Sequence, residues 1–345
     1  MTTVAAALAG VAERFREPLR ALLAGELPVN VALMRLLAEA EDPGQAECAL
    51  AGIASAGLSG PERERLDALG EMLRAHPAAW RTIRAVLAEA RHDGTGPAQD
   101  ARFWAGTFDR LARLSPMAGA ALYSLGDPAL LARITGEAVD VLRGWGLIGP
   151  RTDVLDFGCG AGRMAAALAP LVRTVTGIDV SAGMIGAARR ACAGLPNVRL
   201  EVTEGRDLAI CPDGTLDLVL ALDSFPYLVL AGGGLAERHV EEAARVLRPE
   251  GTLAILNYSY RSDLDADAGD LARAATRCGL ALEEAGTRPF TLWDGVAFRL
   301  RKPPDRFGRN GDGDPSVTPV HPSEDDHGGE RQGHVQPALP ARRTR

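Results

Sequence analysis

The spacing of hydrophobic residues changes once along this chain. In residues 1 to about 92, apolar residues recur every three or four positions, as in VALMRLLAEA and AAWRTIRAVLAEA, which indicates helices. Prolines interrupt this pattern at Pro28, Asp42-Pro43-Gly44, Ser59-Gly60-Pro61 and His76-Pro77. Because proline is tolerated in the first turn of a helix but not in its interior, these breaks predict four or five short helices.

The second part of the chain alternates short apolar runs with helical segments. It follows a stretch with the composition of a linker, His92 to Pro97, and a helix predicted from Asp127-Pro128 through Trp145. The alternating segments are VLDF, GRMAAALAPL, TVTGID, SAGMIGAARRA, VRLEVT, LDLVLAL, AERHVEEAARVLRPEG, TLAILNY and DLARAATRCGL, and then LALEEAG and GVAFRLR as a closing hairpin. Alternation of this kind is typical of βαβ units and a parallel sheet.

Three parts are therefore expected. Residues 1–95 form an α-helical domain, residues 96–302 an α/β domain, and residues 303–345 a disordered tail, because the tail is rich in Pro, Gly and charge without apolar periodicity.

Composition narrows the classes of protein. No run of about 18 apolar residues is present, and no basic segment precedes Glu13, so we expect neither a membrane span nor an export signal. The five cysteines contain no C-x-x-C pair, which argues against a disulfide framework and a zinc site and favours the cytoplasm. The net charge of −7 is spread along the chain without a basic stripe, so nucleic acid is not an expected partner. The histidines of the tail are too scattered for a compact metal site, and no metal is expected.

The most informative segment is VLDFGCGAGR, residues 154–163, in which a strand ends at Asp156 and enters a loop with Gly158, Gly160 and Gly162. Such a loop can turn tightly and bring its peptide groups against a ligand. The dinucleotide fingerprint G-x-G-x-x-G would need its third glycine at position 163, which is Arg163. Asp156 is also unfavourable beside a pyrophosphate, whereas a ligand with a cationic amino group suits it.

This segment resembles the first motif of class I S-adenosylmethionine-dependent methyltransferases, and RVLRPEG resembles the turn before their fifth strand. The resemblance covers residues 120 to 301 and implies a doubly wound, seven-stranded, mostly parallel Rossmann-like sheet. It also implies that Asp156, Gly158, Cys159, Gly160 and Gly162 line the methionine end of the cofactor, with Cys159 as a small wall residue.

Asp179 ends the next strand, and an acidic residue at this distance from the glycine loop can accept both hydroxyl hydrogen bonds of a ribose. The resemblance implies the same role, with Val180 and Met184 beside the adenine. It further implies an acidic residue that recognises the adenine amino group, for which Asp207 is the candidate, or backbone contacts from Arg206 and Leu208. Asp217 resembles the acidic residue that begins the fourth strand of the family. Leu222 and Asp223, at the end of this strand, are expected at the C-terminal edge of the sheet.

The resemblance implies an S-adenosylmethionine-dependent methyltransferase, and a small-molecule acceptor is the expectation. Because a sulfonium is already activated, alignment of the acceptor can supply most of the rate. If a base is used, Asp223 or Tyr227 is the candidate, although Phe225 and Tyr227 could equally be inert walls. His239 lies among charged neighbours and is expected on a solvated helix face.

Several alternatives stay open. Trp293-Asp294-Gly295 predicts a turn, but Tyr258, Tyr260, Arg261 and Trp293 could belong to the acceptor pocket. The helical domain could pack or form a homodimer, or cover the acceptor as a lid, with Ala121 to Tyr123 near its hinge. The rival functions are a cofactor-binding but non-catalytic module that binds a partner, and a nucleotide-dependent oxidoreductase.

Overall fold

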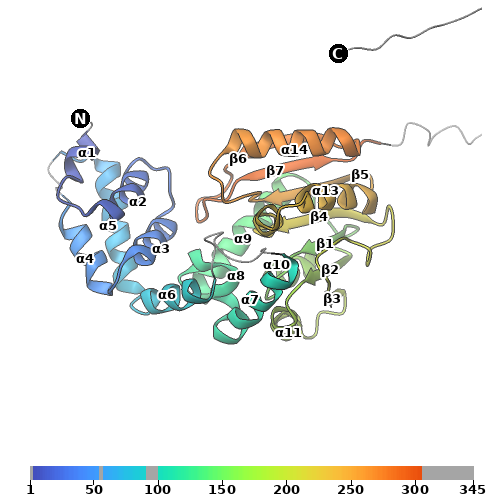
Figure 1. Cartoon of the computed structure of the whole chain (residues 1–345), viewed down its shortest axis with the longest axis horizontal. Helices are drawn as coiled ribbons and strands as arrows, with labels where there is room; N and C mark the ends of the chain where they lie inside the picture. Colours follow the sequence, from blue (N-terminus) through green and yellow to red (C-terminus); the bar gives the residue numbers. More distant parts are fainter. Residues whose placement is uncertain (1–2, 54–56, 91–99, 305–345) are drawn as a thin grey trace, which may run out of the picture. The chain divides into compact units, whose positions relative to one another are not determined.

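The computed structural model describes residues 3–53, 57–90 and 100–304, which belong to one compact unit (Figure 1). The predicted linker at 92–97 and nearly all of the predicted tail lie outside the described residues. The domain boundaries at 95 and 302 therefore stay predictions.

The N-terminal region is helical, as predicted. Its helices are α1 (Thr3–Ala7), α2 (Glu13–Leu23), α3 (Val29–Glu39), α4 (Pro43–Ala51), α5 (Gly60–Ala75) and α6 (Ala79–Glu89). The proline breaks fall where they were expected, because α3 follows Pro28 directly and the Asp42 side chain caps α4. A capping box of Ser59 and Glu62 opens α5.

The prediction of four or five helices was wrong, since this described region has six. The extra break separates α1 from α2, where the helix stops before Val11. The guanidinium of Arg16 donates hydrogen bonds to the carbonyl oxygens of Val11 and Ala9, at 2.8 and 3.3 Å, and so satisfies backbone groups that the interrupted helix leaves free. Val11 itself is buried.

A seven-stranded sheet with the order β3-β2-β1-β4-β5-β7-β6 forms the second region, as the resemblance implied. Strands β1 to β5 are parallel, whereas β7 pairs antiparallel with β5 and with β6, which is the predicted closing hairpin. The strands are β1 (Asp153–Phe157), β2 (Thr174–Asp179), β3 (Val198–Val202), β4 (Leu216–Leu222), β5 (Leu247–Leu256), β6 (Ala281–Thr287) and β7 (Ala297–Arg301).

Helices cover both faces of this sheet. They are α7 (Ala101–Leu114), α8 (Pro116–Ala120), α9 (Pro128–Gly144), α10 (Arg163–Leu168), α11 (Ala182–Ala191), α12 (Phe225–Ala231), α13 (Leu235–Val246) and α14 (Leu264–Cys278), with 3-10 turns at Leu122–Ser124 and Ala169–Leu171. Successive residues of a strand point to opposite faces. Thus Val154 joins the cluster with α9, α10 and α11, and Leu155 joins the cluster with α13 and α14.

Charged residues tie the N-terminal ends of the central strands together. Asp153, at the start of β1, forms ion pairs with Arg173 and, at 2.9 Å, with Arg248, and its backbone N–H donates to Asp217 at 2.7 Å. These contacts hold the pKa of Asp153 well below its usual value. The edge opposite the glycine loop is therefore closed, which leaves the C-terminal edge of the sheet for a ligand.

Candidate functional site

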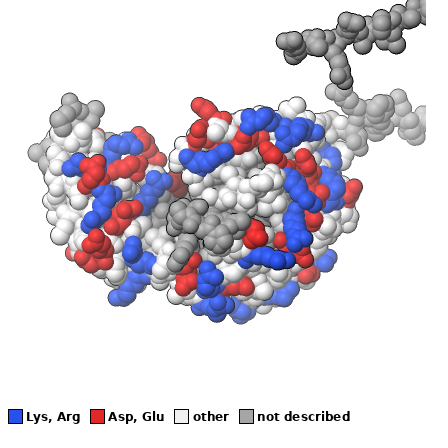
Figure 2. Space-filling view, in the orientation of Figure 1, with Lys and Arg blue, Asp and Glu red and all other residues white. Residues whose placement is uncertain are grey.

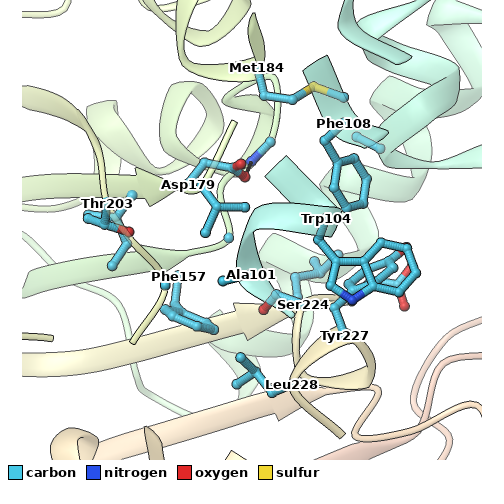
Figure 3. Close-up of a pocket in the computed structure, with 18 of the residues that line it drawn as sticks. Ala101, Trp104, Phe108, Phe157, Asp179, Met184, Thr203, Ser224, Tyr227 and Leu228 are labelled. Carbon is cyan, nitrogen blue, oxygen red and sulfur yellow. Dashed lines mark hydrogen bonds between the residues drawn. The ribbon is translucent and has the colours of Figure 1, made fainter. Parts of the chain in front are cut away.

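A cavity lies at the C-terminal ends of β1, β2 and β4, the edge of the sheet at which doubly wound folds bind their ligands (Figure 3). Its walls come from the glycine loop, from α7, α8, α11, α12 and α13, and from the turns after β2, β3 and β4. The lining residues are Ala101, Trp104, Phe108, Gly119, Ala120, Phe157, Gly158, Gly160, Ile178, Asp179, Val180, Met184, Thr203, Gly205, Leu222, Asp223, Ser224, Tyr227, Leu228, Ala231 and Leu235.

The glycine loop needs its glycines for space as well as for conformation. Gly158 has a φ of +69°, and a Cβ there would lie 2.5 Å from the Cβ of Ser224. At Gly162, with a φ of +83°, a Cβ would lie 2.8 Å from the Cβ of Ala188 on α11. Gly158 thus lets the loop approach the turn after β4, and Gly162 lets α10 begin against α11.

Asp179 connects the loop to α11. One carboxylate oxygen accepts a hydrogen bond from the backbone N–H of Gly160 at 2.9 Å, and the other accepts from the N–H of Ser181 at 2.8 Å. Burial raises the pKa of this carboxyl above its usual value, although these hydrogen bonds favour the charged form. The side chain is therefore held rigidly at the cavity wall.

Asp156 faces a second cavity, which shares Gly158 and Gly160 with the first. Its other lining residues include Cys159, Thr135 and Arg163. Its carboxylate is 2% exposed, and Oδ2 has no hydrogen-bond partner among the described residues. Burial raises the pKa of Asp156 to about 7. Arg163 donates hydrogen bonds to Tyr123 Oη at 2.8 Å and to Thr135 Oγ1 at 3.2 Å.

Helix α7 was not predicted from the sequence, yet it supplies the aromatic wall of the cavity. The ring centroids of Trp104 and Phe108 lie 4.7 and 5.1 Å from that of Tyr227, both edge to face. The three side chains are labelled in Figure 3. Behind this wall, Oδ1 of Asp109 accepts hydrogen bonds from Ser181 Oγ at 2.6 Å and from the N–H of Gly183 at 2.8 Å. Asp109 therefore fastens α7 to the turn that follows Asp179.

A polar cluster follows β4. Asp223 has a φ of +57°, which is strained for a residue with a side chain. Its Oδ1 accepts hydrogen bonds from Asn257 Nδ2 at 2.9 Å and from Tyr260 Oη at 3.2 Å, and Tyr260 Oη lies 3.3 Å from Tyr227 Oη. Burial raises the pKa of Asp223 to about 6.

The predicted site residues fall into three groups. Those that line the first cavity are Gly158, Gly160, Asp179, Val180, Met184, Leu222, Asp223 and Tyr227. Asp156 and Cys159 line only the second cavity, which Gly158, Gly160 and Leu222 share, and Gly162 and Asp207 line neither. Asp207 instead forms an ion pair with Arg238 at 3.5 Å. After β3, the residues that line the first cavity are Thr203 and Gly205.

The expectation that His239 lies on a solvated helix face was wrong. His239 is buried on the same face of α13 as Ala236, Val240 and Ala243, and its ring lies 5.1 Å from the ring of Phe157. Nδ1 is hydrogen-bonded to the carbonyl oxygen of Leu235, and burial lowers the pKa of the ring. His239 is thus a neutral core residue behind the cavity wall.

The alternative acceptor residues near the C-terminus are dispersed. Tyr258 packs in the core, and Arg261 forms ion pairs with Asp267 and Asp270. Trp293 is buried and stacks on Tyr123 with ring centroids 5.5 Å apart. Of the four, only Tyr260 reaches the cluster around Asp223.

Outside the two cavities, three features bear on function: the surface charge, the membrane-spanning potential of the helices and the possible metal ligands. On the face in Figure 2, positive and negative side chains are interspersed. Within the described ranges, no helix is long and apolar enough to cross a bilayer, and no group of His, Cys, Asp and Glu side chains is arranged to hold a metal ion.

Residues 154–251 match the family model described as "Methyltransferase domain". This stretch is a class I S-adenosylmethionine-dependent methyltransferase domain. The demethylmenaquinone methyltransferase of Tropheryma whipplei (strain Twist) is 34% identical over 108 residues, which cover 31% of this chain and 42% of that protein. The 2-methyl-6-phytyl-1,4-hydroquinone methyltransferase of Synechocystis sp. is 27% identical over 147 residues, covering 40% and 44%.

Among solved structures, the magnesium protoporphyrin IX methyltransferase of Synechocystis PCC 6803 with bound S-adenosylmethionine is similar to the methyltransferase domain. The identity is 17% and the TM-score 0.45, with 60% of this chain and 99% of that chain covered. The chain matches less than half the length of each of the two curated relatives.

The residues of this methyltransferase domain fit the cofactor of the family, S-adenosylmethionine. The unpartnered oxygen of Asp156 suits an ammonium group, and Arg163, which has no carboxylate within ion-pair distance among the described residues, suits a carboxylate. Asp179 suits a ribose, and the side chains of Val180 and Met184 suit an adenine ring. A bound cofactor would supply an electrophilic methyl group.

Proposed function

We propose that this protein transfers a methyl group from S-adenosylmethionine to a small-molecule acceptor. The observation that carries the proposal is the continuity of one cavity from Asp179 and the glycine loop to Asp223 and Tyr227. Residues suited to a nucleoside and residues able to accept or donate a proton therefore line the same cavity.

In this proposal the protein acts chiefly by positioning. The glycine loop and Asp179 bind the cofactor, and α7 excludes water with the rings of Trp104 and Phe108. Alignment of two reactants in a near-attack geometry can contribute about 7–11 kcal/mol to lowering a barrier. The names of both curated relatives, which refer to menaquinone and hydroquinone methylation, support a small acceptor.

Calorimetry with S-adenosylhomocysteine and with NAD tests the proposal directly. We expect the wild type to bind S-adenosylhomocysteine and to ignore NAD. Asp179→Ala should weaken the binding by about 1.5–3 kcal/mol, because a hydrogen-bonded carboxylate is lost from the ligand. Asp207→Ala, which removes an acidic side chain outside both cavities, is the matched control and should leave the affinity unchanged.

Two outcomes would count against the proposal. Binding of NAD alone would favour an oxidoreductase. Binding of S-adenosylhomocysteine with no labelled methyl transferred to any fraction of a cell extract would favour a non-catalytic module.

A further inference from the structure

The turn after β4 holds a carboxylate in a pre-organised position beside the cavity. Asp223 lines the cavity, and its backbone N–H donates to the carbonyl oxygen of Leu256 at 2.8 Å, which fixes the turn to the end of β5. Asn257 Nδ2 and Tyr260 Oη then fix Oδ1. Both of these hydrogen bonds, which join Asp223 to described residues, are accepted by Oδ1 and not by Oδ2. One oxygen is thus used for orientation, and the other stays available to a ligand.

The strain at this turn points in the same direction. Asp223 and Asn257, which contact each other, both have a positive φ, of 57° and 77°. Backbone strain of this kind costs about 1–3 kcal/mol per residue and persists where the surrounding structure enforces it, commonly at functional sites. The strained turn forms part of the cavity wall, since Asp223 lines the cavity.

A second polar atom in the same wall also lacks a partner. Ser224 Oγ is buried, lines the cavity and makes no hydrogen bond to any described residue. A buried hydroxyl without a partner costs about 1–3 kcal/mol, so a ligand group that bonds to it would be favoured. Ser224 lies against Gly158, at the junction between the glycine loop and the cluster of Asp223.

The rest of this wall is aromatic and apolar. Trp104 and Phe108 from α7 and Tyr227 from α12 pack edge to face, and Leu228 and Leu235 continue the surface. Such walls favour a flat ring over a flexible polar chain. Burial holds the pKa of Tyr227 above its usual value, so its phenol stays protonated near neutrality and can donate a hydrogen bond, but it is a poor base.

We propose that the acceptor is a hydroxylated aromatic small molecule and that Asp223 is the catalytic base that removes its hydroxyl proton, an inference that rests on the proposed function. The O–H bond of the acceptor breaks, and its proton passes to Asp223 Oδ2. The O–CH₃ bond forms as the C–S bond of the donor breaks, and the electron pair of that bond stays on sulfur, which becomes a neutral thioether. Tyr260 and Asn257 are positioning residues that act through Asp223.

The binding test uses catechol and its dimethyl ether, 1,2-dimethoxybenzene, each titrated into the complex with S-adenosylhomocysteine. We expect catechol to bind at least about tenfold more tightly than the ether, because only catechol can donate a hydrogen bond to Asp223. In Asp223→Asn this preference should fall, while the affinity for S-adenosylhomocysteine stays within about twofold of the wild type. Equal affinities of the wild type for the two probes would overturn the proposal.

The activity test compares hydroxylated aromatics with aromatic amines and thiols as acceptors. We expect methylation of the hydroxylated compounds, with kcat/KM rising as pH increases through about 6, since the base must be ionised. Asp223→Asn should lower kcat/KM about 100-fold or more. Tyr260→Phe should shift the pH profile with a smaller loss. Asp140→Asn, which removes an exposed carboxylate, is the control and should change neither.

The outcomes separate this inference from the proposed function. Transfer only to amines or thiols, no transfer to any hydroxylated aromatic, or full activity of Asp223→Asn would each refute the inference while leaving the cofactor site intact. Failure of the wild type to bind S-adenosylhomocysteine would refute the proposed function itself.

Discussion

Asp156 is a buried carboxyl whose charge should depend on the ligand. Its pKa of about 7 means that the folded protein retains a proton here up to neutral pH. An ammonium group beside the unpartnered oxygen favours the ionised form, so binding releases this proton when the pH is below 7. Acidification should therefore weaken the binding of S-adenosylhomocysteine.

We expect the wild-type affinity to fall as pH decreases from about 7.5 to about 5.5, with a limiting slope of about tenfold per pH unit from this group. In Asp156→Asn that contribution disappears, and the overall affinity is lower at neutral pH. Calorimetry at several pH values measures both effects. A variant with the same pH dependence as the wild type would show that Asp156 does not sense the ligand.

At the residue scale, the sequence pattern was sufficient to place residues whose position depends on a single strand. Asp156 and Asp179 end buried strands, so their positions followed from the pattern of the strands alone. The prediction for His239 was wrong because it was based on the charged neighbours in sequence and not on the helical spacing. It is three and four residues from Ala236 and Ala243, both buried on the core face of α13, and this helical repeat would have identified it as a core residue.

At the scale of the element, Asp109 joins two helices, because its side chain links α7 to the N-terminus of α11. We expect Asp109→Ala to weaken binding of S-adenosylhomocysteine about tenfold, because loss of the hydrogen bonds to Ser181 and Gly183 frees both the aromatic wall and the turn next to Asp179. Asp100→Ala, which removes the N-cap of the same helix, is the matched control for helix stability. If both variants lose affinity equally, the stability of α7 and not its attachment is the cause.

Helices and strands could be predicted where their hydrophobic residues recur with a clear period. The parallel strands and the helices α9, α13 and α14 stood out, whereas α7 and α8 followed the linker without a signal that was recognised. The contacts of α7 with the site join segments more than 70 residues apart, as in the pair of Ser181 and Asp109 with a separation of 72. No local pattern carries that information, so Trp104 and Phe108 were missed.

On the scale of the whole molecule, a buried amide joins the N-terminal helices to the core. The side chain of Asn30 on α3 donates hydrogen bonds to the carbonyl oxygens of Tyr123 and Leu292 at 2.9 and 2.8 Å. Nearby, Arg35 forms an ion pair with Asp294 at 2.7 Å. Tyr123 in turn accepts a hydrogen bond from Arg163, beside the glycine loop, so one path of hydrogen bonds leads from α3 to this loop.

Asn30→Ala should lower the free energy of unfolding by about 1–3 kcal/mol, because two buried carbonyl groups lose their donors. Urea denaturation followed by circular dichroism measures this change. Arg14→Ala, which alters an exposed side chain of α2, should change the stability by less than about 0.5 kcal/mol. Unaltered stability of Asn30→Ala would mean that these two hydrogen bonds do not help to hold the helical region on the core.

The position of α7 also bears on how the protein should be handled at the bench. The family match begins at Val154, well after Trp104 and Phe108, and ends at Gly251, inside β5. A gene trimmed to the matched residues would keep both strand-end carboxylates but would lose α7, the second half of β5, and all of β6 and β7. It would also lack the rings of Trp104 and Phe108, which line the cavity. An inactive fragment of this kind would therefore say nothing about the activity of the longer chain.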